Sequence, residues 1–126
     1  MAWIAVGVGG ALGSMARHGV NRMVAEHWPS LRFPLATAIV NVLGCCLIGV
    51  LAGLLVSERL SMRLAWREFV IVGILGGFTT FSTFGLETIT LIRNGHVHHA
   101  MLNVAVQVLC GLGGVYAGLA MFLRRA

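Results

Sequence analysis

Long apolar stretches separated by short polar segments dominate the chain of 126 residues. Because a membrane-spanning helix needs about 20 mostly apolar residues, the pattern predicts four spans that use nearly the whole chain. Their expected ranges are 1–22, 34–56, 68–92 and 98–123. A cleavable secretory signal would have a basic segment before its apolar core, whereas here the first charged residue is Arg17. We therefore predict a single all-α membrane domain over residues 1–126 with short connections.

Composition narrows the class of protein further. Hydrophobic residues make up 58% of the chain and charged residues only 10%, against about a quarter charged in an ordinary soluble domain. Such a chain has too few polar residues to cover a water-exposed surface. We expect the lipid bilayer as its surroundings, no enzymatic activity and no nucleic-acid partner.

The arginines are divided almost equally between the two ends of the expected bundle. One end receives Arg59, Arg63, Arg67, Arg124 and Arg125, and the other receives Arg17, Arg22, Arg32 and Arg93. An excess of basic residues in the short loops on one side normally fixes the orientation of a chain in the membrane. An almost equal division therefore favours neither orientation strongly. Either one strong loop decides the orientation, or the same chain inserts both ways and two copies form an antiparallel, dual-topology homodimer.

Pairs of glycines at helical spacing recur in every expected span. They are Gly9 and Gly13, Gly49 and Gly53, Gly73 and Gly77, and Gly114 and Gly118. Two small residues four positions apart let helix backbones approach closely in lipid. The pairs predict tight helix packing rather than any chemistry.

A glycine- and threonine-rich segment interrupts the third apolar stretch. Adjacent glycines followed by Thr and Ser form poor helix, and a freed carbonyl in hydrocarbon is tolerated only where it faces protein, a cavity or an ion. If the helix unwinds around 77–80, the carbonyls of Gly76 and Thr79 can coordinate a cation. The alternative is a kinked helix whose threonine hydroxyls bond to the preceding turn. The residues alone leave both possibilities open.

Several side chains near this segment are candidates for a site. The stretch after the break contains Phe81, Ser82, Thr83, Phe84 and Glu87. Glu87 is the one acidic residue well inside an expected span, and an ionisable group there indicates function. The Asn41 amide can donate to an anion, although a hydrogen bond between helices is its more common use.

Three motifs together resemble the Fluc/CrcB family of fluoride channels. They are Gly-Gly-Phe-Thr-Thr-Phe-Ser-Thr-Phe at 76–84, Gly-Gly-Ala-Leu-Gly-Ser-Met-Ala-Arg at 9–17, and Asn-Val-Leu-Gly at 41–44. The resemblance covers the whole chain. It implies a dual-topology homodimer in the bacterial inner (plasma) membrane that exports fluoride passively from the cytoplasm.

The resemblance also implies roles for individual residues. Phe81 and Phe84 would line the fluoride path with their ring edges, Asn41 would donate a hydrogen bond near an entrance, and Ser82, Thr83 and Glu87 would lie on its polar side. Arg17 and Arg22 would favour anions in the vestibules. The Gly76 and Thr79 carbonyls of both subunits would hold a structural sodium ion at the dimer interface.

One departure and two alternatives stay open at this stage. The family often places hydroxyl residues along the pore in the fourth helix, whereas this chain has Asn103, Gln107 and Gly111 there. A proton-coupled small multidrug-type transporter relies on a carboxylate in its first helix, and residues 1–22 contain none. A non-transporting accessory subunit would not need an asparagine and a broken aromatic helix in one bundle.

Overall fold

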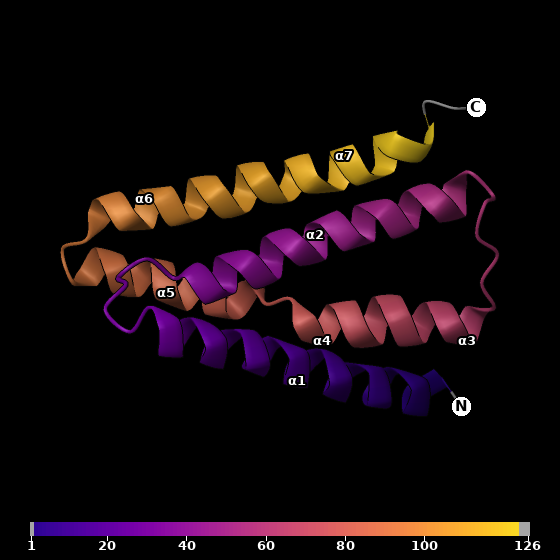
Figure 1. Ribbon diagram of the computed structural model, residues 1–126, viewed down its shortest axis with the longest axis horizontal. Coiled ribbons are helices and arrows are strands. Elements are labelled where there is room, and N and C mark those ends of the chain that lie inside the picture. Colours follow the sequence, from indigo (N-terminus) through magenta and orange to yellow (C-terminus); the bar gives the residue numbers. More distant parts are fainter. Residues whose placement is uncertain (1, 124–126) are drawn as a thin grey trace.

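The computed structural model describes residues 2–123, which form helices joined by short connections (Figure 1). The first helix is α1 (Ala2–His27) and the second is α2 (Leu35–Val56). The third comprises α3 (Leu64–Arg67), the π-helical segment η1 (Glu68–Leu75), α4 (Gly76–Phe78) and, after an interruption, α5 (Phe81–Arg93). The fourth comprises α6 (Val97–Ala105), the π-helical segment η2 (Val106–Cys110) and α7 (Gly111–Leu123). Arg124 and Arg125, which entered the predicted charge balance, lie outside the described residues.

The chain reverses direction at each connection, as predicted for a four-helix membrane domain. The α1–α2 connection and the α5–α6 turn lie at one end of the molecule, and the α2–α3 connection lies at the other end with the beginning of α1 (Figure 1). Within residues 2–123 three helical segments are long and apolar enough to cross a membrane, at 35–56, 64–93 and 97–123. The protein is therefore a multi-pass membrane protein. That α1 forms a fourth span stays a prediction.

The first helix is longer than its apolar pattern indicated. We predicted its end near residue 22, but α1 continues to His27, so the connection shortens to residues 28–34. Polar residues in its last turns had suggested a loop. They remain helical because exposed groups can pair along the helix surface, as the Arg22 guanidinium does with the Glu26 carboxylate at 3.0 Å.

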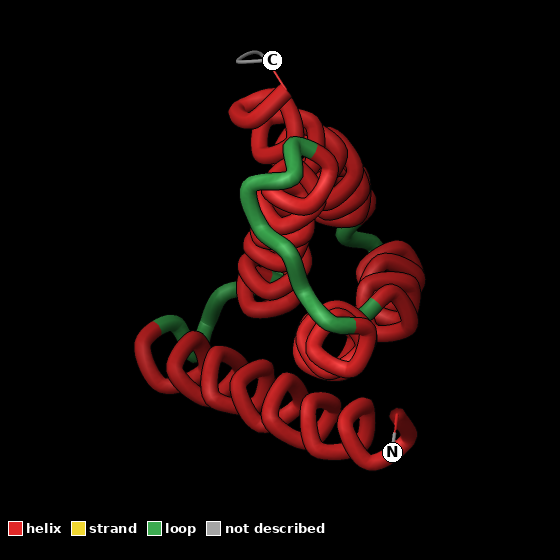
Figure 2. The backbone as a smooth tube through the Cα atoms, turned by 90° about the vertical axis from the view of Figure 1, so that its right-hand side faces the viewer, coloured by secondary structure: helices red, strands yellow, loops and turns green. Residues whose placement is uncertain are grey.

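The glycine pairs lie where helix backbones approach each other within the chain, which confirms their predicted role in packing. A Cβ atom at Gly77 would lie 2.5 Å from the Gly10 carbonyl oxygen, and one at Gly118 would lie 2.5 Å from the Val50 nitrogen. Gly9 and Gly73 face each other in the same way. These contacts join α1 to η1 and α4, and α2 to α7. In Figure 2, α1 lies across one side of the stack that the other helices form.

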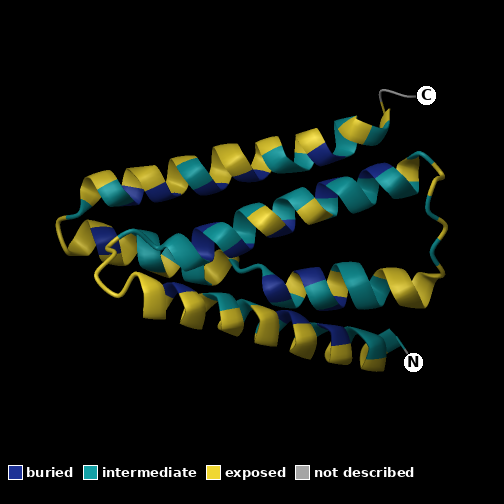
Figure 3. Ribbon diagram, in the orientation of Figure 1, coloured by how far each residue is buried: buried dark blue, intermediate teal, exposed yellow. Residues whose placement is uncertain are grey.

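Large apolar side chains cover the outside of the molecule, as a lipid surrounding requires. The outer faces of α1, α6 and α7 are exposed along their lengths (Figure 3). Trp3 is 90% exposed at one end of α1, Trp66 is 60% exposed in α3 at the same end, and Trp28 is 53% exposed at the opposite end. Tryptophans at both ends suit the two membrane–water interfaces.

The contact between α1 and α4 gives a first testable prediction. In Gly77→Ala the new methyl group meets the Gly10 backbone, which cannot move without shifting α1. We therefore expect the free energy of unfolding to fall by about 1–3 kcal/mol. Thermal or detergent-induced unfolding of the purified protein measures this change. Gly7→Ala is the control, because a Cβ there meets nothing within 4 Å. Equal stability of the two variants would contradict the close packing of α1 on α4.

Candidate functional site

The third helix is interrupted in the middle of its span. Thr79 (φ −80°, ψ 159°) and Thr80 (φ −153°, ψ 115°) are extended, α4 ends at Phe78, and α5 begins at Phe81. The Thr79 hydroxyl also bonds back to the Leu75 carbonyl oxygen at 3.0 Å, as the kinked-helix alternative expected. The backbone nevertheless leaves the helix for two residues, so the segment is a break rather than a kink.

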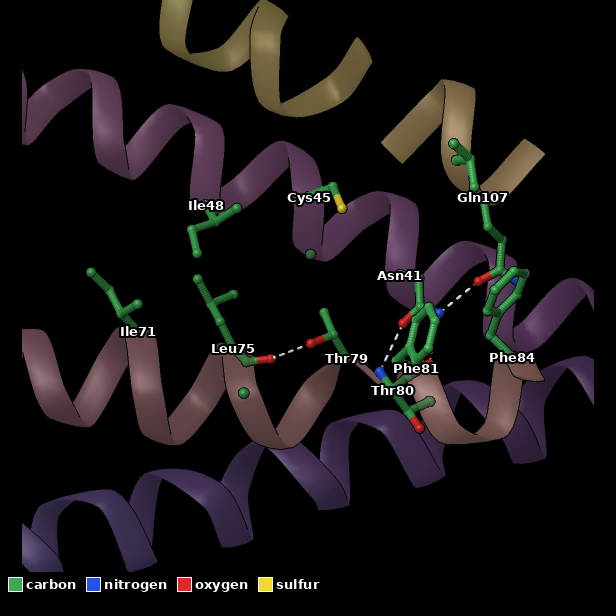
Figure 4. A pocket seen from close by; sticks show the side chains of 13 residues that line it. Asn41, Cys45, Ile48, Ile71, Leu75, Thr79, Thr80, Phe81, Phe84 and Gln107 are labelled. Carbon is green, nitrogen blue, oxygen red and sulfur yellow. Dashed lines mark hydrogen bonds between the residues drawn. The ribbon is translucent and has the colours of Figure 1, made fainter. Parts of the chain in front are cut away.

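Asn41 of α2 holds this break. Its Oδ1 accepts a hydrogen bond from the Thr80 N–H at 2.8 Å (Figure 4). Its Nδ2 donates to the Thr80 carbonyl oxygen at 2.9 Å. An extended residue presents its N–H and C=O on the same side, so one primary amide satisfies both, as a neighbouring β-strand would. Nδ2 also donates to Gln107 Oε1 at 2.6 Å. Asn41 therefore joins three helical segments, and both of its N–H donors have partners.

Thr80 also begins the next helix. Its hydroxyl oxygen accepts a hydrogen bond from the Thr83 N–H at 3.3 Å and donates to the Thr83 hydroxyl at 3.0 Å, so it caps the N-terminus of α5. Ser82 is exposed, and its hydroxyl lies 3.3 Å from that of Thr80. The partly positive N-terminus of α5 therefore faces the break.

A groove of about 410 Å³ opens beside the break (Figure 4). Its lining residues are Asn41, Gly44, Cys45, Ile48, Ile71, Leu75, Gly76, Thr79, Thr80, Phe81, Phe84, Gln107 and Val108. Phe81 and Phe84 form part of its wall with ring centroids 5.5 Å apart and ring planes at 49°. Phe81 is 81% exposed, so its ring does little packing within the chain.

The structure thus brings together some predicted site residues and leaves others apart. Asn41, Phe81, Phe84, Gly76 and Thr79 all line the groove, whereas Ser82, Thr83 and Glu87 do not.

Glu87 is held by a residue that the sequence analysis missed. The Thr37 hydroxyl donates to Glu87 Oε1 at 2.8 Å, and among the described residues Glu87 Oε2 is buried without a hydrogen-bond partner. Thr37 lies four positions before Asn41 and therefore on the same face of α2. That spacing was the available signal for it.

The two predicted cation ligands are both carbonyl oxygens, but they differ in the hydrogen bonds that they already accept. Carbonyl oxygens suit a hard cation such as sodium. The Gly76 carbonyl oxygen lacks the usual helical hydrogen bond from the residue four positions on, because the Thr80 N–H donates to Asn41 instead. The Thr79 carbonyl oxygen accepts a hydrogen bond from Arg17 Nη1 at 3.3 Å. A cation at both oxygens would therefore share the Thr79 carbonyl oxygen, through its second lone pair, with Arg17.

The two predicted vestibule arginines differ in their surroundings. Arg17 is half-buried and directed at the break through Thr79, whereas Arg22 is exposed and paired with Glu26. Glu26 offsets the charge of Arg22. We expected no carboxylate in the first helix, but α1 extends to His27 and therefore includes Glu26 in its last turn. The Glu26 side chain is 60% exposed and is already paired with Arg22.

Comparison with known proteins identifies the family of this chain. Residues 4–119 match the family described as CrcB-like protein, Camphor Resistance (CrcB). A relative from Hydrogenovibrio crunogenus named "Fluoride-specific ion channel FluC" is 45% identical over 116 residues, 92% of this chain and 86% of the relative. A relative of the same name from Paracoccus denitrificans is 45% identical over 93% of this chain and 90% of the relative. Another, from Hyphomonas neptunium, is 40% identical over 97% of this chain and 95% of the relative. The chain belongs to the CrcB-like protein family.

Proposed function

We propose that this protein is a fluoride channel that exports the anion passively from the bacterial cytoplasm across the inner membrane. The relatives named as fluoride-specific channels support this function. The observation that carries it is the groove in which the Phe81 and Phe84 rings lie beside the Asn41 amide and the helix break (Figure 4). All three features suit a small anion and none adds a fixed positive charge.

Weak, distributed attraction is what an anion pathway requires. An aromatic ring has a positive edge and a negative face, so ring edges replace part of the water around fluoride. The N-terminus of α5 adds a partial positive charge at the same place. Conduction needs binding strong enough for entry and weak enough for exit. For Asn41 to donate to the ion, its Nδ2 group would exchange the Gln107 oxygen for fluoride. The membrane potential contributes ~2.3 kcal/mol per charge per 100 mV.

The proposed assembly is an antiparallel homodimer of chains inserted in both directions, with α1 as the fourth span. Among the described residues, Arg59, Arg63 and Arg67 lie at one end and Arg22, Arg32 and Arg93 lie at the other, while Arg17, counted with the second group, reaches the break. This nearly even division supports dual topology. Two copies would also bring together two sets of Gly76 and Thr79 carbonyls, and a structural sodium ion held by them would neutralise the carbonyl dipoles that the break exposes.

Fluoride efflux from liposomes tests the function and separates it from the alternatives. Purified protein in fluoride-loaded liposomes, with a potassium ionophore to remove the opposing voltage, should release fluoride rapidly and almost no chloride. Proton-dependent uptake of organic cations would instead support a small multidrug-type transporter. Absence of both activities would contradict a transport function.

The two phenylalanines give a sharper prediction. Phe81→Ile and Phe84→Ile keep apolar bulk but remove the ring edge, so each should reduce fluoride efflux per folded protein by about tenfold or more. Phe81 is so exposed that its substitution should not destabilise the chain. Leu86→Ile, at a residue that is 69% exposed on α5 and absent from the groove, is the matched control. If both phenylalanine variants conduct like the control, the rings are packing residues and not part of the path.

Dual topology predicts that a C-terminal reporter is found on both sides of the membrane. Paired fusions, one active only outside the cytoplasm and one only inside, should both give signal. Ser61→Lys adds a basic residue to the α2–α3 connection, and we expect it to shift most copies to one orientation because the starting balance is so even. A signal from one side only, in the unsubstituted protein, would exclude dual topology.

A further inference from the structure

A continuous series of side-chain hydrogen bonds leaves the break and returns to α5 further along the same helix. Asn41 Nδ2 donates to Gln107 Oε1 at 2.6 Å, and Gln107 Nε2 donates to Asn103 Oδ1 at 2.7 Å. Asn103 Nδ2 then donates to the Thr88 hydroxyl at 3.0 Å, and that hydroxyl donates to the Phe84 carbonyl oxygen at 2.7 Å. We name these four residues, Asn41, Gln107, Asn103 and Thr88, the amide ladder.

The amide ladder begins and ends at the groove, which Gln107 also lines, whereas Asn103 and Thr88 are not among the lining residues. Asn103 is fully buried and Gln107 is only 9% exposed. The ladder starts from Asn41, which holds Thr80, and finishes on the carbonyl of Phe84. It therefore connects the break to the helical turn that carries one of the two rings.

The hydrogen bonds also fix the direction of each amide. Each step donates from Asn41 towards Phe84, so turning the Gln107 amide over would set its NH₂ group against that of Asn41. Unpaired polar groups are costly in an apolar interior, which disfavours that arrangement. The Asn41 amide is thereby held with its oxygen towards the Thr80 N–H, as the break requires.

We infer that Asn103 and Thr88, which do not line the groove, are positioning residues: through Gln107 they orient the Asn41 amide, and they hold the Phe84 turn, without contacting the ion. The inference rests on the proposed fluoride pathway for its effect on transport. If the ladder were only a link between helices, its loss would lower stability and leave the break and the transport rate per folded protein unchanged.

Two threonines on α5 allow a matched test. Thr88 and Thr90 both donate to the carbonyl oxygen four residues earlier, at 2.7 and 2.8 Å, but only Thr88 also accepts from Asn103. Thr88→Val should reduce fluoride efflux per folded protein by roughly three- to tenfold, the range expected for one lost hydrogen bond within a membrane. Thr88→Ser, which keeps the hydroxyl, should restore it. Thr90→Val should behave like the unsubstituted protein.

Hydrogen exchange of the Thr80 amide supplies a readout that does not depend on fluoride. Thr88→Val should speed this exchange because it loosens, through Asn103 and Gln107, the Asn41 amide that holds the Thr80 N–H, whereas Thr90→Val should not. Asn103→Leu breaks the ladder at a second place and should reproduce both effects, so the test stands even if Thr88→Val folds poorly. Equal Thr80 exchange and equal efflux in all variants would overturn the inference. An unsubstituted protein without fluoride efflux would overturn the proposed function, while the exchange comparison would still decide the positioning role.

Discussion

In the interior of a membrane every backbone N–H and C=O must find a partner within the protein, because lipid offers none. The third helix meets this requirement in an unusual way at Thr80, whose N–H leaves the helical ladder while its C=O begins that of α5. The primary amide of Asn41 accepts a hydrogen bond from this N–H and also donates to the Thr80 carbonyl oxygen. Without that amide an unwound Thr79–Thr80 segment would expose unpaired polar groups to hydrocarbon, and a continuous helix would be favoured.

The remaining features of the site depend on this break. It creates a new helix N-terminus in the middle of the span, capped by Thr80, and it places Phe81 on the first turn of α5 with its ring exposed. It also frees the Gly76 carbonyl oxygen. The glycines of α1 and α4 support the segment from behind, since their close contact brings Ser14 and Arg17 to the Gly77 and Thr79 carbonyls. The same few residues thus provide the hydrogen bonds of the break, the contact between α1 and α4, and the surface proposed to attract the anion.

Much of the fold could be predicted from the sequence, because the apolar stretches and the glycine pairs report directly on spans and close contacts. The location of the break was also predictable from Gly77 and the threonines that follow it. The partner of each polar side chain was not, since a hydrogen bond such as Thr37 to Glu87 joins residues 50 positions apart. The end of α1 was misplaced because exposed polar residues at a membrane surface look alike in a helix and in a loop.

The dependence of the break on Asn41 can be measured most directly by the backbone NMR chemical shifts of Thr79 and Thr80 in isotope-labelled protein in lipid. In the unsubstituted protein both residues should show the Cα and Cβ shifts of extended backbone, between helical residues on either side. In Asn41→Leu, which keeps the branching at Cγ but has no amide, these shifts should move towards helical values. Helical shifts at both threonines in the unsubstituted protein, or extended shifts that the substitution leaves unchanged, would contradict the role assigned to Asn41.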